Sequence, residues 1–367
     1  MTVAIYLSVI LVNFIYYLEC KNKKKNNKTL IILSTLFIGM IYSAGINNVD
    51  MNYYDYNGGY SQTIKGIELG YYVILQICRR FQLGLVFERS CFFVVGYGFM
   101  IAALRKNCIN IHLFLTIYMV ILFPIDAVQM RFFVASSIVY FAFSYMYGKN
   151  KNIKKYIFWI VVAAMFQTSI IALLVLLVGE LKYKKLWIKL VAASTIFLEL
   201  VFVLNGRNDP FLGSLINFFL SGNGTRMFQY LSSNTNNGSL FVVLLILMNI
   251  ILSWYNHKSL TINKQFDNYA EQSKYVFYFN LLQLFFIPLL WLSVEFYRFP
   301  RVLLFITIGT VVNTFVISTK LTKRKLNLVL LTLITVSFWF YMIYFRVSNF
   351  TEIFEPIFMN NLLNIYE

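Results

Sequence analysis

Charged residues are scarce in this chain of 367 residues: they make up 13% of it, against about 25% in soluble domains. Histidine occurs only twice, and the four cysteines show neither CxxC spacing nor a Cys/His pattern, which argues against a zinc site and a disulfide framework. The sequence contains no Walker A motif, no GxGxxG motif and no heptad repeat. We therefore expect no metal, no cofactor and no nucleic-acid partner.

Apolar residues dominate instead, with 59% hydrophobic residues, 19% aromatic residues and a mean hydropathy of +0.67. They form repeated long runs in which apolar and polar positions do not alternate, so membrane-spanning helices are favoured over the strands of a β-barrel. We expect an all-α, polytopic integral membrane protein in which residues 1–367 form a single membrane domain.

Lysine clusters set the expected orientation, because cytoplasmic loops carry an excess of Lys and Arg. The cluster at 21–28 places the end of the first span in the cytoplasm, and the later clusters then place both termini outside. This interpretation gives about ten full spans: 2–18, 29–46, 90–104, 109–125, 132–147, 186–204, 240–255, 275–292, 302–319 and 326–345.

The stretch 67–83 is apolar enough to span, but it contains Arg79 and Arg80, which are costly deep in a bilayer. We expect it to form a helix at the outer surface instead. Two long extracytoplasmic loops follow from this topology, one at 47–89, which includes the surface helix, and one at 205–238.

The stretch 156–178 is apolar but has lysine clusters at both ends. A single span would place one cluster outside, so we predict a short helical hairpin whose tip lies near Gln167 and Ser169. Non-helical backbone at membrane depth is tolerated only where protein or water surrounds it. The polar side chains at this tip are therefore candidate site residues, although they could simply satisfy the backbone of the turn.

The expected outer and inner cations differ in type. Nine of the ten outer cations are arginine, whereas 20 of the 22 inner ones are lysine. Arginine recognises phosphate and carboxylate groups through paired hydrogen bonds. Arg131, Arg298 and Arg301 lie near the outer ends of expected spans, where charges are candidate functional groups. They suggest a phosphate-bearing lipid as ligand, although Arg131 could instead cap its helix and pair with Asp126.

The stretch 47–72 is the first long polar interruption of the chain, with three carboxylates, six tyrosines and four glycines. We interpret it as a lid over a sugar-binding site. Tyr54 and Tyr60 could stack on sugar rings, but interfacial tyrosines also form the ordinary aromatic belt of membrane proteins.

Four segments, in their order along the chain, resemble the EpsG/Wzy-type polymerases of bacterial surface polysaccharides. Residues 68–71 (ELGY) are similar to a Glu-Pro-Gly-aromatic motif, 126–135 to the start of an Ile-Arg-Gln-x-x-Ala helix, 166–169 (FQTS) to Phe-His-x-Ser, and 295–301 to a late Arg-aromatic segment. The resemblance covers roughly residues 40–180 and, more loosely, 290–310. Leu69 stands where the family has proline, and Gln167 stands where it has histidine; glutamine cannot titrate.

The resemblance implies a metal-independent glycosyltransferase at the outer face of the bacterial cytoplasmic membrane. A hydroxyl group of one lipid-linked repeat unit would attack the anomeric carbon of another, and undecaprenyl pyrophosphate would leave. The expected partners are the lipid-linked oligosaccharide and the membrane, with a chain-length regulator as a further candidate. Two alternatives stay open: an O-antigen ligase-like or other lipid-phosphosugar glycosyltransferase, and a lipid-linked oligosaccharide flippase or transporter.

This reaction needs a base and a positive site for the leaving pyrophosphate. We predict Asp50 as the base, with Glu68 as its rival and Asp126 as a further candidate. Arg131 is the first choice for the pyrophosphate, and Arg298 or Arg301 the second. The remaining candidates for substrate binding are Tyr54, Tyr60, Gln167 and Ser169.

Overall fold

The structure is a computed structural model, and it describes residues 1–20, 26–46, 68–149, 151–180, 183–204, 238–261, 267–292, 297–318, 321–344 and 350–364. Every regular element in these ranges is a helix, as the sequence predicts. Asp50, Tyr54, Tyr60 and nearly all of the predicted second outer loop lie outside the described residues.

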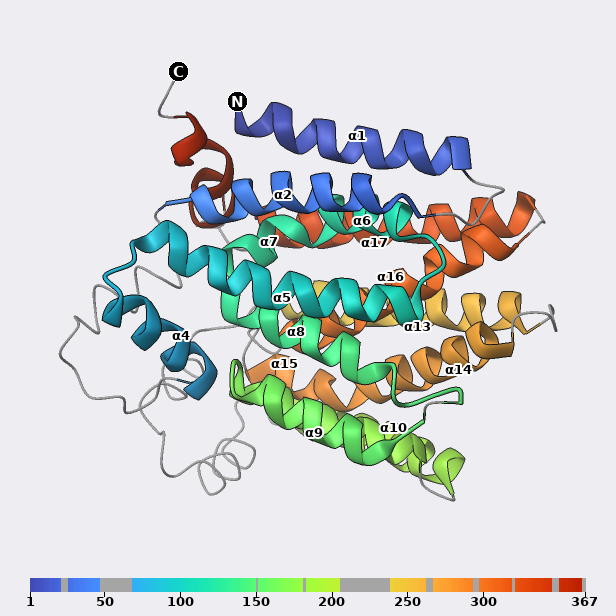
Figure 1. The fold of residues 1–367 in the computed structure, drawn as a ribbon. Helices are drawn as coiled ribbons and strands as arrows, with labels where there is room; N and C mark the ends of the chain where they lie inside the picture. The colour runs from blue at the N-terminus through green and yellow to red at the C-terminus, as the bar shows by residue number, and fades with distance from the viewer. Residues whose placement is uncertain are drawn as a thin grey trace.

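The helices form a bundle whose long members run back and forth along roughly one direction (Figure 1). In chain order they are α1 (Thr2–Cys20), α2 (Lys28–Ala44), α4 (Leu69–Arg80), α5 (Leu85–Asn107), α6 (Ile111–Ile121), α7 (Phe123–Val128), α8 (Met130–Phe143), α9 (Ile153–Ala164), η1 (Thr168–Glu180), α10 (Lys184–Leu204), α13 (Gly238–Leu260), α14 (Asp267–Leu282), η3 (Gln283–Phe286), α15 (Ile287–Leu292), α16 (Arg298–Ile317), α17 (Leu321–Tyr344), η5 (Phe350–Met359) and η6 (Leu362–Asn364).

Both termini lie at the same end of this bundle, together with α4 and α7 (left in Figure 1). The Thr2 backbone N–H donates to Asn364 Oδ1 over 3.0 Å, and Gly45 forms an isolated antiparallel bridge with Asn361. We call this the predicted outer end and the opposite one the predicted inner end. Each name refers to the orientation expected from the lysine clusters, which stays a prediction.

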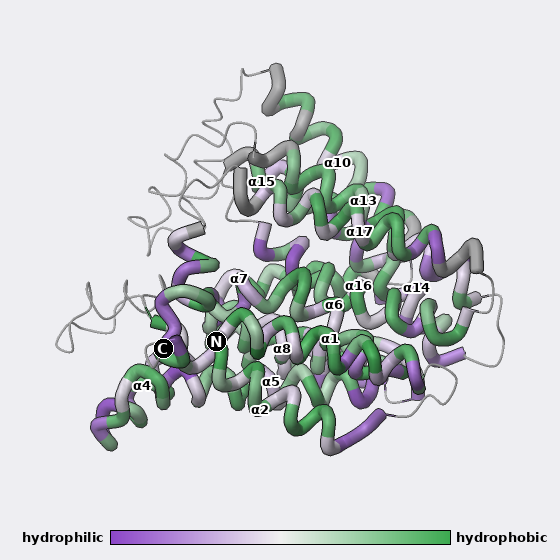
Figure 2. The backbone as a smooth tube through the Cα atoms, turned by 90° about the horizontal axis from the view of Figure 1, so that it is seen from above, coloured by the Kyte–Doolittle hydropathy of each residue, from purple (hydrophilic) through white to green (hydrophobic). Residues whose placement is uncertain are grey.

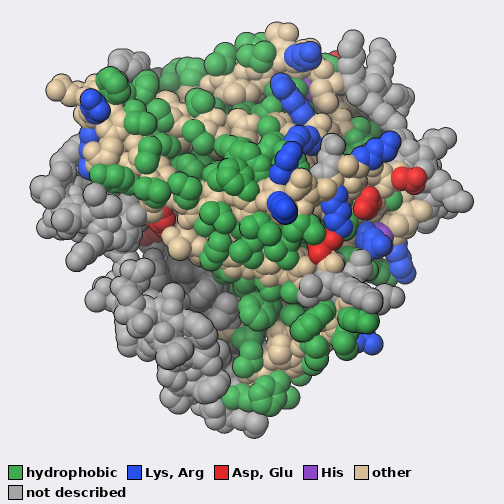
Figure 3. All heavy atoms as spheres, turned by 60° about the horizontal axis from the view of Figure 1, so that its bottom comes forward, with side chains coloured by type: hydrophobic (Ala, Val, Ile, Leu, Met, Phe, Trp, Pro, Cys, Tyr) green, Lys and Arg blue, Asp and Glu red, His purple; other side chains and the backbone are tan. Residues whose placement is uncertain are grey.

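Four of the described helices are long and apolar enough to cross a membrane: Thr2–Cys20, Leu85–Asn107, Phe241–Leu260 and Arg298–Ile317. The count of ten spans stays a prediction. Hydrophobic residues line the bodies of the helices and hydrophilic residues gather toward their ends (Figure 2). On the face in Figure 3, hydrophobic side chains cover a broad area while most lysines and arginines gather toward one side, a pattern expected of a protein that contacts lipid.

Helix α16 is almost entirely buried among its neighbours, whereas α1 exposes a row of large apolar side chains that includes Leu7 and Leu11. Between the helices, buried amides supply hydrogen bonds. Asn249 Nδ2 of α13 donates to Asn280 Oδ1 of α14 over 2.8 Å, and Asn280 Nδ2 donates to Thr307 Oγ1 of α16 over 3.0 Å. Such bonds stabilise helix packing where lipid provides no hydrophobic driving force between helices.

Gly309 lets α16 approach α8 closely, and it provides a test of this packing. A Cβ atom at Gly309 would overlap the Tyr140 hydroxyl, and the Tyr140 side chain is fully buried. We expect Gly309→Ala to lower the free energy of unfolding by about 1–3 kcal/mol through overpacking. Thermal unfolding of the detergent-solubilised protein measures this. Gly98→Ala is the control, since a Cβ there meets nothing within 4 Å; equal midpoints for both variants would contradict the close packing.

Helices α9 and η1 pack side by side as a hairpin. The Tyr156 hydroxyl donates to the Leu173 carbonyl over 3.1 Å, and an ion pair between Lys151 and Glu180 joins the two ends of the hairpin. The second arm is a 3-10 helix of 13 residues, about 26 Å long, whereas α9 has 12 residues and is about 18 Å long. Both arms are shorter than the roughly 30 Å of bilayer hydrocarbon, and their depth in a membrane stays a prediction.

Candidate functional site

An ion pair between Glu68 and Arg131 lies at the predicted outer end. Glu68 immediately precedes α4, and Arg131 lies in the first turn of α8. Arg131 Nη1 is 2.6 Å from Glu68 Oε2, and the side chains are 12% and 13% exposed. The pair is thus largely, but not completely, shielded from solvent. The structure brings together two of the three residues that the sequence predicts to be catalytic.

The start of α4 packs against the turn of the hairpin formed by α9 and η1. The Gly70 backbone N–H donates to the Met165 carbonyl over 2.8 Å, and a Cβ at Gly70 would lie 3.0 Å from the Phe166 ring. The next residue, Tyr71, is fully buried, and its ring lies 5.5 Å from the Arg131 guanidinium carbon. Glycine at position 70 therefore permits the close approach that places Glu68 beside Arg131.

The turn between α7 and α8 is formed by Gln129, whose backbone leaves the helical conformation at φ −94° and ψ 68°. Its side chain bridges two residues of the last third of the chain. Gln129 Oε1 accepts a hydrogen bond from Arg301 Nη1 over 2.7 Å, and Gln129 Nε2 donates to the Tyr297 hydroxyl over 2.8 Å. This bridge fixes the turn from which Arg131 projects.

A second ion pair joins Asp126 of α7 to Arg301 of α16, with 3.0 Å between Oδ1 and Nη2. Each side chain is only 2% exposed, and the guanidinium carbon lies 4.0 Å from the centre of the Phe132 ring. Asp126 therefore pairs with Arg301. It is not the partner of Arg131, as the alternative interpretation of Arg131 as a helix cap had expected. A pair so deeply buried is suited to holding α7 against α16.

Three other predicted binding residues lie at the same end but are less enclosed: Arg298, Gln167 and Ser169. Arg298 is the first residue of α16 and is half-buried. Gln167 and Ser169 are half-buried at the turn of the hairpin, with 3.5 Å between Gln167 Nε2 and Ser169 Oγ, a distance at the limit of a hydrogen bond. Through the neighbouring Phe166, this turn touches α4.

Sequence reasoning missed Arg89 as well as Gln129 and Tyr297. Arg89 is 1% exposed, and it donates to the Tyr42 carbonyl through Nε over 2.8 Å and to the Ala127 carbonyl through Nη2 over 3.2 Å. It thus ties the end of α2 to α7, beside Asp126. The sequence did show an arginine close to the start of an apolar run, which could have marked Arg89 as a candidate. Its carbonyl partners could not be predicted, because they depend on tertiary packing.

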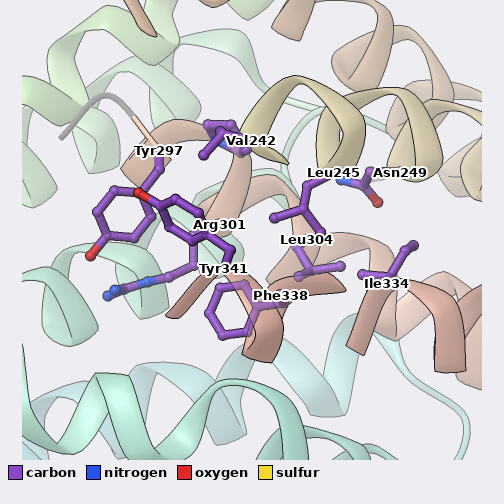
Figure 4. Close-up of a pocket in the computed structure, with 10 residues that line it drawn as sticks. Val242, Leu245, Asn249, Tyr297, Arg301, Leu304, Ile334, Phe338 and Tyr341 are labelled. Atoms are coloured by element: carbon purple, nitrogen blue, oxygen red, sulfur yellow. The ribbon is translucent and has the colours of Figure 1, made fainter. Parts of the chain in front are cut away.

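Arg301 and Tyr297 also line a small, mostly apolar pocket between α13, α16 and α17 (Figure 4). The figure shows the guanidinium beside the Tyr297 ring, with Asn249 and Ile334 toward the other end of the pocket. Among the described residues, no group of three or more His, Cys, Asp and Glu side chains could hold a metal ion.

The fold and the site together define a helical membrane protein that carries two arginine–carboxylate pairs at one end of its bundle. A model of the EpsG family matches residues 47–356, which is most of the chain, and the chain belongs to that family. The resemblance expected from the sequence is thereby confirmed. No curated protein and no solved structure matches the chain significantly. Membership of the family indicates a role of the polysaccharide-polymerase type.

Proposed function

We propose that this protein joins repeat units carried on undecaprenyl pyrophosphate into a surface polysaccharide at the outer face of the bacterial cytoplasmic membrane. The observation that carries the proposal is the partly shielded Glu68–Arg131 pair in a member of the EpsG family. A guanidinium is suited to a leaving pyrophosphate, and a carboxylate is suited to the proton of an attacking hydroxyl.

In the proposed reaction, the donor pyrophosphate replaces Glu68 as the partner of Arg131. Glu68 is then free to accept the proton of the acceptor hydroxyl. The hydroxyl oxygen forms a bond to the anomeric carbon while the bond from that carbon to the pyrophosphate oxygen breaks, and lipid pyrophosphate leaves with the bonding electrons. Charge develops on this oxygen, where Arg131 stabilises it without metal assistance.

We assign the role of base to Glu68 because it lies beside Arg131. The sequence-based preference for Asp50 stays a prediction, since Asp50 lies outside the described residues. We assign Asp126, Gln129 and Arg301 to positioning, because their mutual contacts fix the turn before α8. Arg298, Gln167 and Ser169 are proposed to contact the sugar or phosphate from the edge of the site.

Removal of the gene from its host tests this proposal through the product at the cell surface. Loss of a polymerase leaves single repeat units on the surface acceptor, and re-expression of the chain restores a ladder of lengths on a gel. Loss of a flippase leaves no repeat units outside at all. The second pattern, or an unchanged ladder, would contradict the proposed reaction.

A further inference from the structure

A polar cavity of about 680 Å³ lies among the end of α5, the turn after α8 and the starts of α9 and α14. These segments lie at the predicted inner end, away from α4 (Figure 1). The size of the cavity falls in the range of roughly 300–1,000 Å³ that is typical of small-molecule sites. Four of the residues that line it are lysines, and its lining contains no Asp or Glu. These lysines are Lys106, Lys149, Lys151 and Lys155.

The lysines converge on the cavity from separate elements. Lys106 comes from the end of α5, Lys149 and Lys151 come from the turn after α8, and Lys155 comes from the first turn of α9. An excess of lysine on cytoplasmic loops explains why these residues are present at this end of the protein. It does not explain why four of them surround one concavity, where like charges focus the electric field.

Tyr145 holds two of these charges close together. Lys106 Nζ lies 4.5 Å from the centre of the Tyr145 ring, and Lys155 Nζ lies 5.5 Å from it. Cation–π attraction at an aromatic face offsets part of the repulsion between the two ammonium groups. Among the described residues, Lys151 is the lysine of this cavity that forms an ion pair, with Glu180.

Hydrogen-bonding side chains complete the lining. Asn107, which is fully buried, lines the cavity, and so do Asn268 and Tyr269 from the first turn of α14. An anion in the cavity would therefore meet ammonium, amide and hydroxyl groups. Two carboxylates contact lining residues: Glu180 pairs with Lys151, and Glu271 accepts a hydrogen bond from the Gly148 backbone N–H. Lysine binds phosphate as a point charge and does not need the bidentate geometry of arginine.

We propose that this lysine-lined cavity is a second binding site, which takes an anion with two or more phosphate charges. The site is separate from the proposed polymerisation site and does not rest on it. The same chemistry is offered by a soluble polyphosphate-type anion and by the headgroup of an acidic phospholipid.

Lysine acylation of the wild-type protein, quantified by mass spectrometry, tests the site without a mutation. In phosphatidylcholine nanodiscs, inorganic pyrophosphate is expected to slow the acylation of Lys106 and Lys155 at least threefold while leaving Lys258 unchanged. Lys258 is a suitable reference because it lies at the same end, in the last turn of α13. If nanodiscs that contain cardiolipin, whose headgroup carries two phosphates, give this protection without pyrophosphate, the headgroup is the ligand. Uniform protection, or none under either condition, overturns the proposal.

Binding of pyrophosphate by variants gives an independent measurement. The double variant Lys106→Gln/Lys155→Gln is expected to lose affinity at least tenfold and to show a weaker dependence on salt. Lys258→Gln/Lys325→Gln removes the same charge outside the cavity, so its affinity should change less than twofold. Lys106→Arg/Lys155→Arg should retain binding and thus controls for folding. Equal losses in the two glutamine variants would assign the effect to net charge and overturn the proposal.

Discussion

Replacement of Arg131 by lysine is expected to reduce polymerisation about 10²- to 10³-fold, the usual effect of removing one donor from a charge-stabilising site. Lysine keeps the positive charge but has no planar fork, so it cannot hold a pyrophosphate through two parallel hydrogen bonds. The ladder of chain lengths should collapse to single units or very short chains. Gel analysis of the surface polysaccharide from complemented cells measures this.

Arg80→Lys is the matched control. Arg80 lies at the same predicted outer end, in the last turn of α4, and its side chain is exposed. Its replacement should leave the ladder unchanged. Both variants should unfold at the wild-type temperature if folding is intact. A full ladder from Arg131→Lys would refute the assignment of Arg131 to the pyrophosphate.

Asp126→Asn is expected to lower the free energy of unfolding by about 3–5 kcal/mol, because it leaves the charge of Arg301 buried without its carboxylate. Both side chains of this pair are 2% exposed, so bulk solvent screens the remaining charge only weakly. Thermal unfolding of the detergent-solubilised protein, followed by tryptophan fluorescence, measures the effect.

Two further variants test whether the uncompensated charge of Arg301, rather than the loss of any carboxylate, lowers the stability. Asp267→Asn removes an exposed charge at the start of α14 and should change stability by less than about 0.5 kcal/mol. Asp126→Leu/Arg301→Met removes both charges and should recover much of the stability, since replacing a whole buried pair by apolar residues is often neutral. If the double variant were less stable than Asp126→Asn, the uncompensated charge would not be the cause.

The helical class and most apolar segments could be predicted from the sequence, because apolar runs without alternation leave few alternatives in lipid. Breaks within segments were harder to predict. The expected span at 109–125 divides into α6 and α7, since Pro124 lacks a backbone N–H and is best placed in the first turn of a helix. The expected span at 275–292 contains the 3-10 turn η3, which no strong sequence pattern indicates.

The candidate site was predictable in its residue types but not in its pairings. Arginines near the ends of apolar runs pointed to Arg131 and Arg301, and a segment recognised by resemblance contained Glu68. Hydrophobic periodicity does not say which helices are neighbours. It could therefore not show that Arg301 pairs with Asp126, 175 positions away in the sequence, or that Glu68 pairs with Arg131. Gln129 was part of a segment recognised by resemblance, yet its bridging role depends on the start of α16 lying beside the turn between α7 and α8.

The most direct test uses the purified protein in nanodiscs together with repeat units linked to undecaprenyl pyrophosphate. We expect a ladder of lipid-linked chains and the release of one lipid pyrophosphate for each linkage formed, with Arg131→Lys defective in both. Translocation of the lipid-linked units without any new linkage, or transfer only to an unrelated acceptor, would contradict the proposed polymerisation.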